Sequence, residues 1–192
     1  MVKVDYFRVL EELSALLLSA VSASCKDGAM LSKEKLCEIK MECDKKICAL
    51  EDALFCDFIT PIERDNIAAL AHCISRAIDK AIDYQCEAQR LRKYCPSGIN
   101  NEEAGICAAL AERLCRDTEL LRKRRRSEVM PSSAEFRALL RKGREAHVRS
   151  LAALGRGIYP KNYGQLLITT ARLRHELSRC FDELVEVMLN NI

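Results

Sequence analysis

Apolar residues recur at steps of three and four along almost the whole chain, and this spacing restricts its fold more than any other feature. The clearest stripe is Ile67, Leu70, Ile74, Ile78 and Ala81. Only 7 glycines and 4 prolines punctuate the 192 residues, too few for the many turns of a β protein. Apolar residues make up 49% and charged residues 31%, a composition that folds rather than stays disordered. The sequence therefore predicts an all-α protein of long amphipathic helices.

Breaks in the pattern divide the first half into three predicted helices. The first ends near residues 26–28, and the second begins near Ser32. The third is predicted to begin sharply at residues 60–63, whose sequence is Thr-Pro-Ile-Glu. In this interpretation Thr60 is the N-cap, Pro61 takes the first helical position, and Glu63 closes a capping box.

Three more helices are predicted in the second half, after a break at residues 95–98. The fourth runs from about residue 101 to 128 and is broken by Pro131. A second capping box at residues 132–135 starts the fifth helix, which continues through residue 154. Residues 155–157, Gly-Arg-Gly, end the fifth helix, and the sixth begins after Pro160.

A weak internal repeat at an offset of 99 residues relates the two halves. Residues 59–61, Ile-Thr-Pro, overlay residues 158–160, Ile-Tyr-Pro. Further on, the overlaid pairs are Ile74 with Leu173, Ile78 with Leu177, Ile82 with Phe181, and Asp83 with Asp182. The repeat predicts two tandem antiparallel three-helix bundles, residues 1–95 and 96–192, in one compact domain. The alternative is chance, because any two amphipathic helices can be aligned.

Cysteine usage and charge restrict the environment and the class of partner. The eleven cysteines are odd in number and lack any C-x-x-C pair, so we expect free, mostly buried thiols in a reducing cytoplasm. The longest nearly apolar run, residues 13–23, is about half of what a membrane span needs, so any membrane association should come through a partner. A net charge of +3 is too small to indicate nucleic-acid binding.

Residues 58–71, Phe-Ile-Thr-Pro-Ile-Glu-Arg-Asp-Asn-Ile-Ala-Ala-Leu-Ala, form the most specific stretch of the sequence. They resemble the F-I-T-P-x-D-R-E-D-I-x-x-L-A signature of the PhoU-like family, in the branch found beside Pit-type phosphate permeases. Thr60, Pro61, Arg64 and Asp65 are the signature residues in this chain. The resemblance implies a non-enzymatic, cytoplasmic accessory protein that regulates inorganic phosphate transport through protein contacts. Its implied partner is a phosphate permease or a phosphate-signalling protein, and self-association stays open.

The resemblance also implies metal sites built from acidic pairs spaced four residues apart on one helix face. The corresponding positions hold Lys40 with Asp44, Ser75 with Asp79, Gly143 with His147, and Arg174 with Ser178. The candidate ligands that remain are Asp44, Asp79, Asp83, Asp182 and His147. Because basic residues stand at two ligand positions, we expect no cofactor and interpret these acids as solvated or ion-paired. The alternative is a metal-binding helical bundle that holds a divalent or trivalent ion weakly.

The densest run of charge is Arg122, Lys123, Arg124, Arg125 and Arg126. It predicts a docking patch for an acidic partner or an anion, and the alternative is an exposed, solubilising helix end. The sequence has no glycine-rich phosphate loop and no H-E-x-x-H motif, and its three histidines fall in three different predicted helices. We therefore predict that the protein is not an enzyme.

Overall fold

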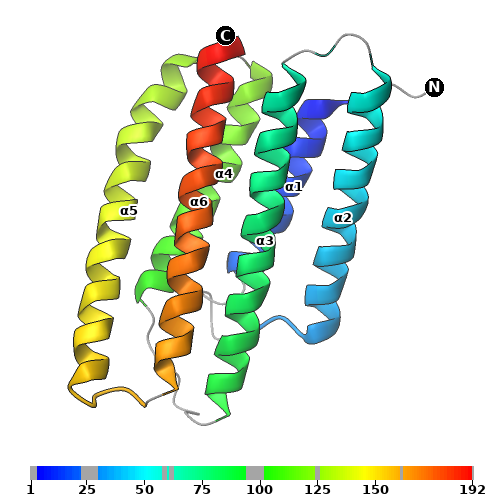
Figure 1. Ribbon diagram of the computed structural model, residues 1–192. Coiled ribbons are helices and arrows are strands. Elements are labelled where there is room, and N and C mark those ends of the chain that lie inside the picture. Colours follow the sequence, from blue (N-terminus) through cyan, green and yellow to red (C-terminus); the bar gives the residue numbers. More distant parts are fainter. Residues whose placement is uncertain are drawn as a thin grey trace.

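The structure is a computed structural model, and its described residues form six helices and no strand (Figure 1). The described residues are 4–22, 30–57, 60, 63–93, 102–123, 126–160 and 162–191, with the backbone alone for 126–131 and 191. The helices are α1 (Tyr6–Ser22), α2 (Lys33–Cys56), α3 (Arg64–Arg92), α4 (Glu102–Lys123), α5 (Arg126–Gly155) and α6 (Tyr163–Asn191). The all-α prediction is confirmed.

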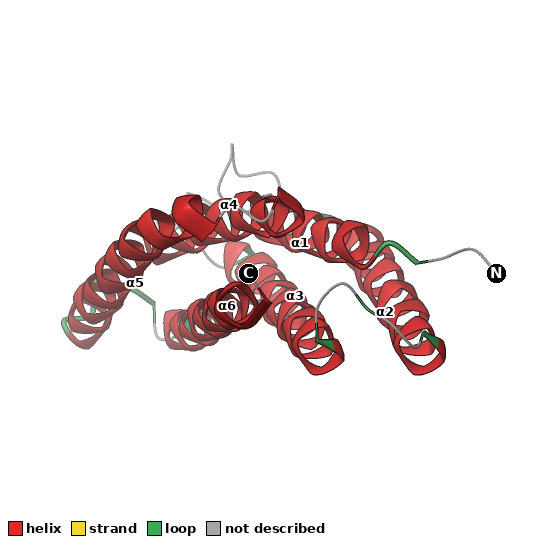
Figure 2. Cartoon of the chain, turned by 90° about the horizontal axis from the view of Figure 1, so that it is seen from above, coloured by secondary structure: helices red, strands yellow, loops and turns green. Residues whose placement is uncertain are grey.

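The helices pack as an arc with two helices inside it. Seen from above, α5, α4, α1 and α2 form the arc, and α6 and α3 lie side by side within it (Figure 2). Helices α1, α2 and α3 contact one another, and so do α4, α5 and α6. The two sets meet where α3 packs on α6 and α1 packs on α4. This arrangement is consistent with two tandem three-helix bundles. The predicted break at residues 95–98 lies outside the described residues, so the boundary between residues 95 and 96 stays a prediction.

The bounds of the helices follow the predicted offset of 99 residues. Helices α3 and α6 both have 29 residues, and they start and end at positions separated by that offset. Helices α2 and α5 end 99 residues apart as well. Ile74 with Leu173 and Ile78 with Leu177 are fully buried at equivalent places. The last helix of each half therefore has the same length and buries residues at equivalent positions.

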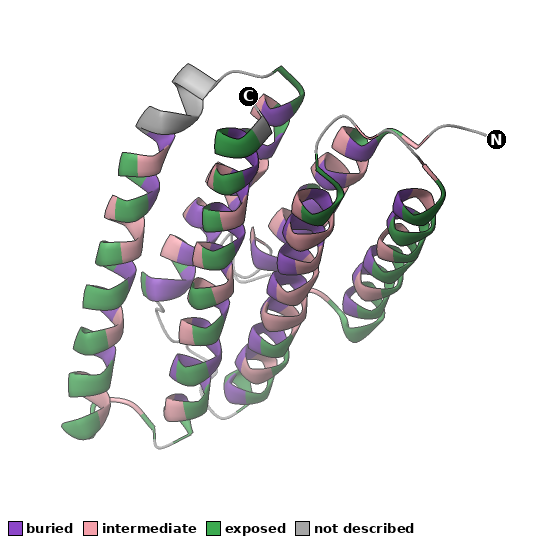
Figure 3. Cartoon of the chain, turned by 45° about the horizontal axis from the view of Figure 1, so that its top comes forward, coloured by how far each residue is buried: buried purple, intermediate pink, exposed green. Residues whose placement is uncertain are grey.

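The core lies between the arc and the two inner helices, and buried residues follow one face of each helix (Figure 3). All five residues of the stripe that begins at Ile67 are buried, as predicted. The rings of Phe136 and Phe181 stack with their centroids 4.0 Å apart and join α5 to α6. No described helix is both long enough and apolar enough to cross a lipid bilayer.

Two predicted helix ends agree with the structure. Ser32 is the N-cap of α2, and its Oγ accepts a hydrogen bond from the amide of Lys35 at 3.2 Å. Beyond α5, Gly157 has a φ of 73°, in the left-handed region that favours glycine. The amide of Ile158 donates to the carbonyl of Ala153 at 3.0 Å, as in a Schellman motif.

The predicted start of the third helix is wrong by about one turn. Helix α3 begins at Arg64, its N-cap is Glu63, and the Glu63 side chain makes no capping hydrogen bond. Thr60 therefore lies before the N-cap residue, and Pro61 lies outside the described residues. Contacts with other elements hold this connection instead. Arg64 donates to the backbone oxygen of Asp57, whose carboxylate accepts a hydrogen bond from the Tyr6 hydroxyl at 2.6 Å.

The predicted break at Pro131 is also wrong, because α5 begins at Arg126 and continues through residue 131. Helix α4 ends at Lys123 and α5 begins at Arg126, so Pro131 lies inside α5 and not at its start. Ser132 was predicted to begin a capping box, but it is buried and its hydroxyl is used elsewhere. Its Oγ donates to Asp117 and accepts from Arg113 Nε at 2.6 Å, both on α4. The serine therefore fastens α5 to α4 and does not start a helix.

The cysteines are only partly as predicted. The nine that lie among the described residues are all free. Four are buried, Cys115 is half-buried and four are exposed, so the expectation of mostly buried thiols is wrong. The buried ones are Cys43, Cys73, Cys107 and Cys180, and the exposed ones are Cys37, Cys48, Cys56 and Cys86. Helical spacing places the second group on outward faces.

Candidate functional site

A lysine joins the two candidate metal ligands of the first half. Lys40 Nζ, on α2, lies 3.0 Å from Asp44 Oδ1 on the same helix and 2.8 Å from Asp79 Oδ1 on α3. Partial burial disfavours the charge of Lys40, but its hydrogen bonds to Asp79 and Asp44 outweigh this and raise its pKa. The ammonium group is thus a built-in cation that links both carboxylates, which matches the ion-paired interpretation.

The groove around these acids does not suit a metal ion. It lies between α2 and α3, has a volume of about 430 Å³, and contains Asp79 and Asp83. Lys40, Lys33 and Lys80 line the same groove, and Lys80 Nζ lies 2.8 Å from Asp83 Oδ2. Three ammonium groups facing two carboxylates repel a cation. Among the described residues no three His, Cys, Asp or Glu side chains converge as metal ligands would.

In the second half, His147 and Arg174, which stand at positions where the resemblance implies metal ligands, lie around a buried glutamate. Glu103, in the first turn of α4, is 0% exposed. Its Oε2 lies 2.9 Å from His147 Nδ1 on α5, and its Oε1 lies 2.7 Å from Arg174 Nη1 on α6. Burial raises the pKa of Glu103, while the hydrogen bond to His147 and the charge of Arg174 oppose that rise. His147 is therefore held by a carboxylate, and Asp182, exposed on α6, is not part of this cluster.

Gly143 makes room for the arginine of this cluster. A Cβ atom at position 143 would lie 2.8 Å from Cδ of Arg174 and 3.4 Å from Cγ2 of Ile106. The glycine is buried in the middle of α5, where glycine is a poor helix former. Its place is explained by the passage of the Arg174 side chain across α5 toward Glu103.

Sequence reasoning missed Glu103, although a signal was present. Glu102 and Glu103 read together as acids that favour a helix N-terminus. Glu102 is indeed exposed and pairs with Arg149 at 2.9 Å. Glu103, however, falls on the helical stripe of Cys107 and Leu110 and is buried with them. An acid on an apolar stripe indicates that a basic side chain from another helix will meet it.

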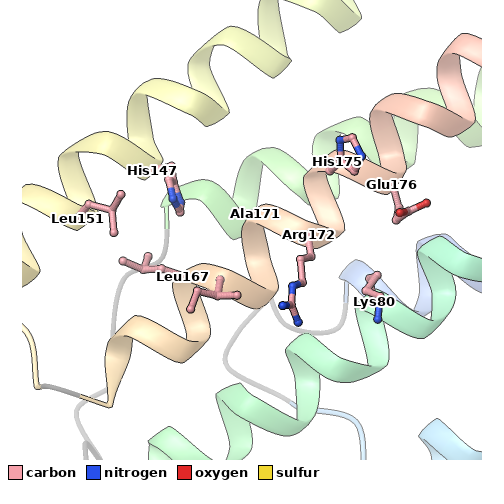
Figure 4. A pocket seen from close by; sticks show the side chains of 9 residues that line it. Lys80, His147, Leu151, Leu167, Ala171, Arg172, His175 and Glu176 are labelled. Carbon is pink, nitrogen blue, oxygen red and sulfur yellow. The ribbon is translucent and has the colours of Figure 1, made fainter.

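A second groove, of about 500 Å³, lies between α5 and α6 (Figure 4). Its lining residues are Lys80, His147, Leu151, Leu167, Ile168, Ala171, Arg172, His175 and Glu176. His147 and Leu151 come from α5, Lys80 comes from α3, and the others come from α6. His147 is the one candidate site residue predicted from the sequence that lines this groove, because the groove forms only where three helices meet.

One residue of the basic run, Arg122, forms ion pairs within the protein. Arg122 Nη1 lies 2.9 Å from Asp5 Oδ2, and its Nε lies 2.9 Å from Glu11 Oε1. The guanidinium therefore binds α4 to α1 and is not free for a partner. Lys123 is exposed. Arg124 and Arg125 lie outside the described residues, as does the side chain of Arg126, so the rest of this patch stays a prediction.

The signature residues surround the connection between α2 and α3. Arg64 holds the end of α2 through Asp57, and Asp65 is exposed in the first turn of α3. Their described contacts are structural ones that set how the two helices join.

Comparisons with known proteins find similarity in structure but not in sequence. No family model and no curated protein matches the chain. Two solved structures from Shewanella oneidensis MR-1 are similar to it. One, assigned as a PhoU-like phosphate regulatory protein, has a TM-score of 0.59 and 13% identity over 96% of this chain and 95% of the other. The second, a PhoU-like protein, has a TM-score of 0.58 and 14% identity over the same shares. The chain therefore has the fold of these PhoU-like proteins.

Proposed function

We propose that this protein is a cytoplasmic, non-enzymatic regulator of inorganic phosphate transport that acts by contact with a phosphate permease or a phosphate-signalling protein. The observation that supports this most is the similarity to a PhoU-like phosphate regulatory protein over 96% of the chain. The signature-like stretch at residues 58–71 supports the same function independently, through its sequence. The link to Pit-type permeases rests on that stretch.

The ion pairs support regulation without a bound metal. In the first half Lys40 supplies the positive charge that Asp44 and Asp79 require. In the second half Arg174 does the same for the buried Glu103. The pair of Glu103 and Arg174 is buried, and removing one partner of a buried ion pair leaves an uncompensated charge and is strongly destabilising. The pairs of Lys40 are more exposed and link α2 to α3. A metal ion would have to displace Lys40, and the rival function as a metal-binding bundle therefore has little support.

The test is phosphate uptake by the cells from which the gene comes. Deleting the gene should change the rate of radiolabelled phosphate uptake, and the unaltered gene supplied from a plasmid should restore it. Crosslinking in intact cells should join the protein to a phosphate permease or a phosphate-signalling protein. Unchanged uptake after deletion, under both phosphate-rich and phosphate-poor growth, would contradict the proposal.

A further inference from the structure

We propose that the groove between α5 and α6 docks an acidic, amphipathic helix of a partner protein. This inference rests on the proposed function, because it names the surface through which the regulator makes contact. The groove is lined by aliphatic side chains, among them Leu151 and Leu167, and by basic side chains, among them His147, Arg172 and Lys80 (Figure 4).

The aliphatic part is exposed where the two helices meet. Leu151 on α5 and Ile168 on α6 are each 47% exposed, and Leu167 lies buried beside them. Val148, one turn before Leu151 on α5, is 63% exposed. Exposed aliphatic side chains that gather in one place, with polar residues around them, are typical of an interaction site. The hollow gives an apolar side chain of a partner a place to insert.

The charged part of the groove is predominantly basic. Lys80, Arg172, His147 and His175 line it, and Glu176 is its one acid among the described residues. Glu176 Oε2 lies 3.5 Å from Arg76 Nε and 3.7 Å from Arg179 Nη1, so its charge is balanced from within the protein. Arg172 and His175 have no ion-pair partner among the described residues. Lys80 is paired with Asp83 and His147 with Glu103, so the positive charge that the groove offers to an incoming segment is carried by Arg172.

The basic character continues along α5. Arg137, Arg141 and Arg144 are exposed and have no ion-pair partner in the described part of the chain. Their spacing of four and three places them on the same helix face as Val148 and Leu151. From residue 137 to residue 151 this face is about 21 Å long at 1.5 Å per residue. That length matches about four turns of a partner helix.

An acidic amphipathic helix is the occupant that fits both kinds of side chain. Its apolar residues would enter between Leu151 and Ile168, and its carboxylates would meet the guanidinium groups of α5 and α6. Arginine suits this contact because its planar group binds carboxylates with two parallel hydrogen bonds. A membrane surface fits less well, since a lipid bilayer meets protruding apolar residues whereas these line a hollow.

The equivalent groove of the first half lacks this character. Between α2 and α3, Lys40 is engaged by Asp44 and Asp79, and Lys80 is engaged by Asp83. Two of the three lysines in that groove are thus paired inside the protein, and Lys33 is the third. The α5–α6 groove differs because the exposed Arg137, Arg141 and Arg144 extend its free positive charge along α5.

The experiment uses the full chain and a designed probe. The probe is a fluorescein-labelled helical peptide of about 15 residues, long enough to hold helix, with two leucines one turn apart flanked by glutamates. Fluorescence anisotropy should show saturable binding that weakens as salt rises. Leu151→Asp and Arg172→Glu should each weaken binding roughly tenfold or more. Lys45→Glu, an exposed charge reversal on α2, is the matched control and should leave affinity unchanged; circular dichroism and melting should show that all three variants fold.

Four outcomes would overturn the inference. These are equal binding of a peptide with lysines in place of the glutamates, unchanged affinity in both groove variants, stronger binding to phosphatidylglycerol vesicles than to the peptide, and a dimer that Leu151→Asp dissociates. The proposed function is tested separately by returning Arg172→Glu to the deletion strain. Full restoration of uptake would refute the proposed docking groove but not the proposed role in phosphate transport. If deletion does not change uptake but the peptide binds as expected, the proposed role in phosphate transport is wrong and the docking groove is supported.

Discussion

Gly143 and Arg174 fit together across the contact between α5 and α6, since a Cβ atom on the glycine would lie 2.8 Å from Cδ of the arginine. The head of Arg174 is held 2.7 Å from the buried carboxylate of Glu103, so the side chain cannot swing away freely. The absence of a side chain at residue 143 thus allows Arg174 to reach Glu103 and to balance its negative charge.

Gly143→Ala should lower the stability of the protein. In an ordinary helix interior the same change stabilises by about 1 kcal/mol. At position 143 overpacking against Arg174 should cost roughly 1–3 kcal/mol and reverse the sign. Urea unfolding followed by circular dichroism measures the difference. The matched control is Gly105→Ala on α4, where an added Cβ would meet nothing within 4 Å, and which should stabilise. Stabilisation by both substitutions would show that the Arg174 side chain can move away from residue 143 without loss of stability.

Glu103→Gln should change how stability depends on pH. Burial, the largest cause, raises the folded-state pKa of Glu103 above its ordinary value of 4.5. The folded protein then binds this proton more tightly than the unfolded chain, so the stabilisation is full below about pH 4.5 and is lost as pH rises through the folded-state pKa. Glutamine does not titrate. The free energy of unfolding of the variant, minus that of the unaltered protein, should therefore increase with pH above 4.5.

Unfolding in urea at a series of pH values checks this slope. The variant also loses the contacts with Arg174 and His147, which lowers its free energy of unfolding at every pH. The test is therefore the slope of the difference in free energy of unfolding against pH. Glu102→Gln is the control, because it removes a neighbouring carboxylate that stays in water. A difference that stays level or falls as pH rises would contradict the prediction.

Lys40→Glu should make the protein responsive to metal. The change replaces the ammonium between Asp44 and Asp79 with a third carboxylate, and close like charges are relieved by a cation. Manganese at ten times its dissociation constant would contribute about 1.4 kcal/mol, which raises the Tm of a chain of this size by roughly 3–5 °C. The unaltered protein should show no shift and carry no stoichiometric iron, manganese or zinc in elemental analysis. Adding Asp79→Asn to the variant should remove the response, and stoichiometric metal in the unaltered protein would refute the role given to Lys40.

The described cysteines should react with iodoacetamide in two groups. Burial raises the pKa of the Cys43, Cys73 and Cys180 thiols and so lowers the fraction of reactive thiolate. The exposed group, Cys37, Cys48, Cys56 and Cys86, should be labelled first. Mass spectrometry of peptides after short labelling, with and without urea, follows each site. Rapid labelling of Cys180 in the folded protein would show that the α3–α6 contact opens readily.

Local sequence could predict what depends on one helix at a time. Helical spacing identified the buried stripe at Ile67 and Ile74, and a single side chain identified the start of α2 at Ser32. Prediction from local sequence failed where contacts with another helix determine the role of a side chain. Ser132 reads as a cap but is bound by α4, and Thr60 reads as a cap where Arg64 and Asp57 hold the connection.

The candidate site follows the same division. Asp44, Asp79 and the unusual Lys40 could be identified through the resemblance to the PhoU-like family, which implies acidic pairs four residues apart at these positions. The burial of Glu103 was signalled only by its place on the apolar stripe of α4, and its partner Arg174 comes from α6. The α5–α6 groove could not be predicted, because Leu151 and Ile168 become neighbours only when the helices pack.

The matching lengths of α3 and α6 have a consequence for stoichiometry. A body made of two similar halves ordinarily offers two similar faces, and a partner can then bind twice or in either direction. Here Lys40 is paired inside the protein with Asp44 and Asp79, while Arg172 has no ion-pair partner among the described residues. An acidic partner is consequently attracted more strongly to the α5–α6 groove than to the α2–α3 groove. The proposed groove therefore predicts that each copy of the protein binds one partner helix.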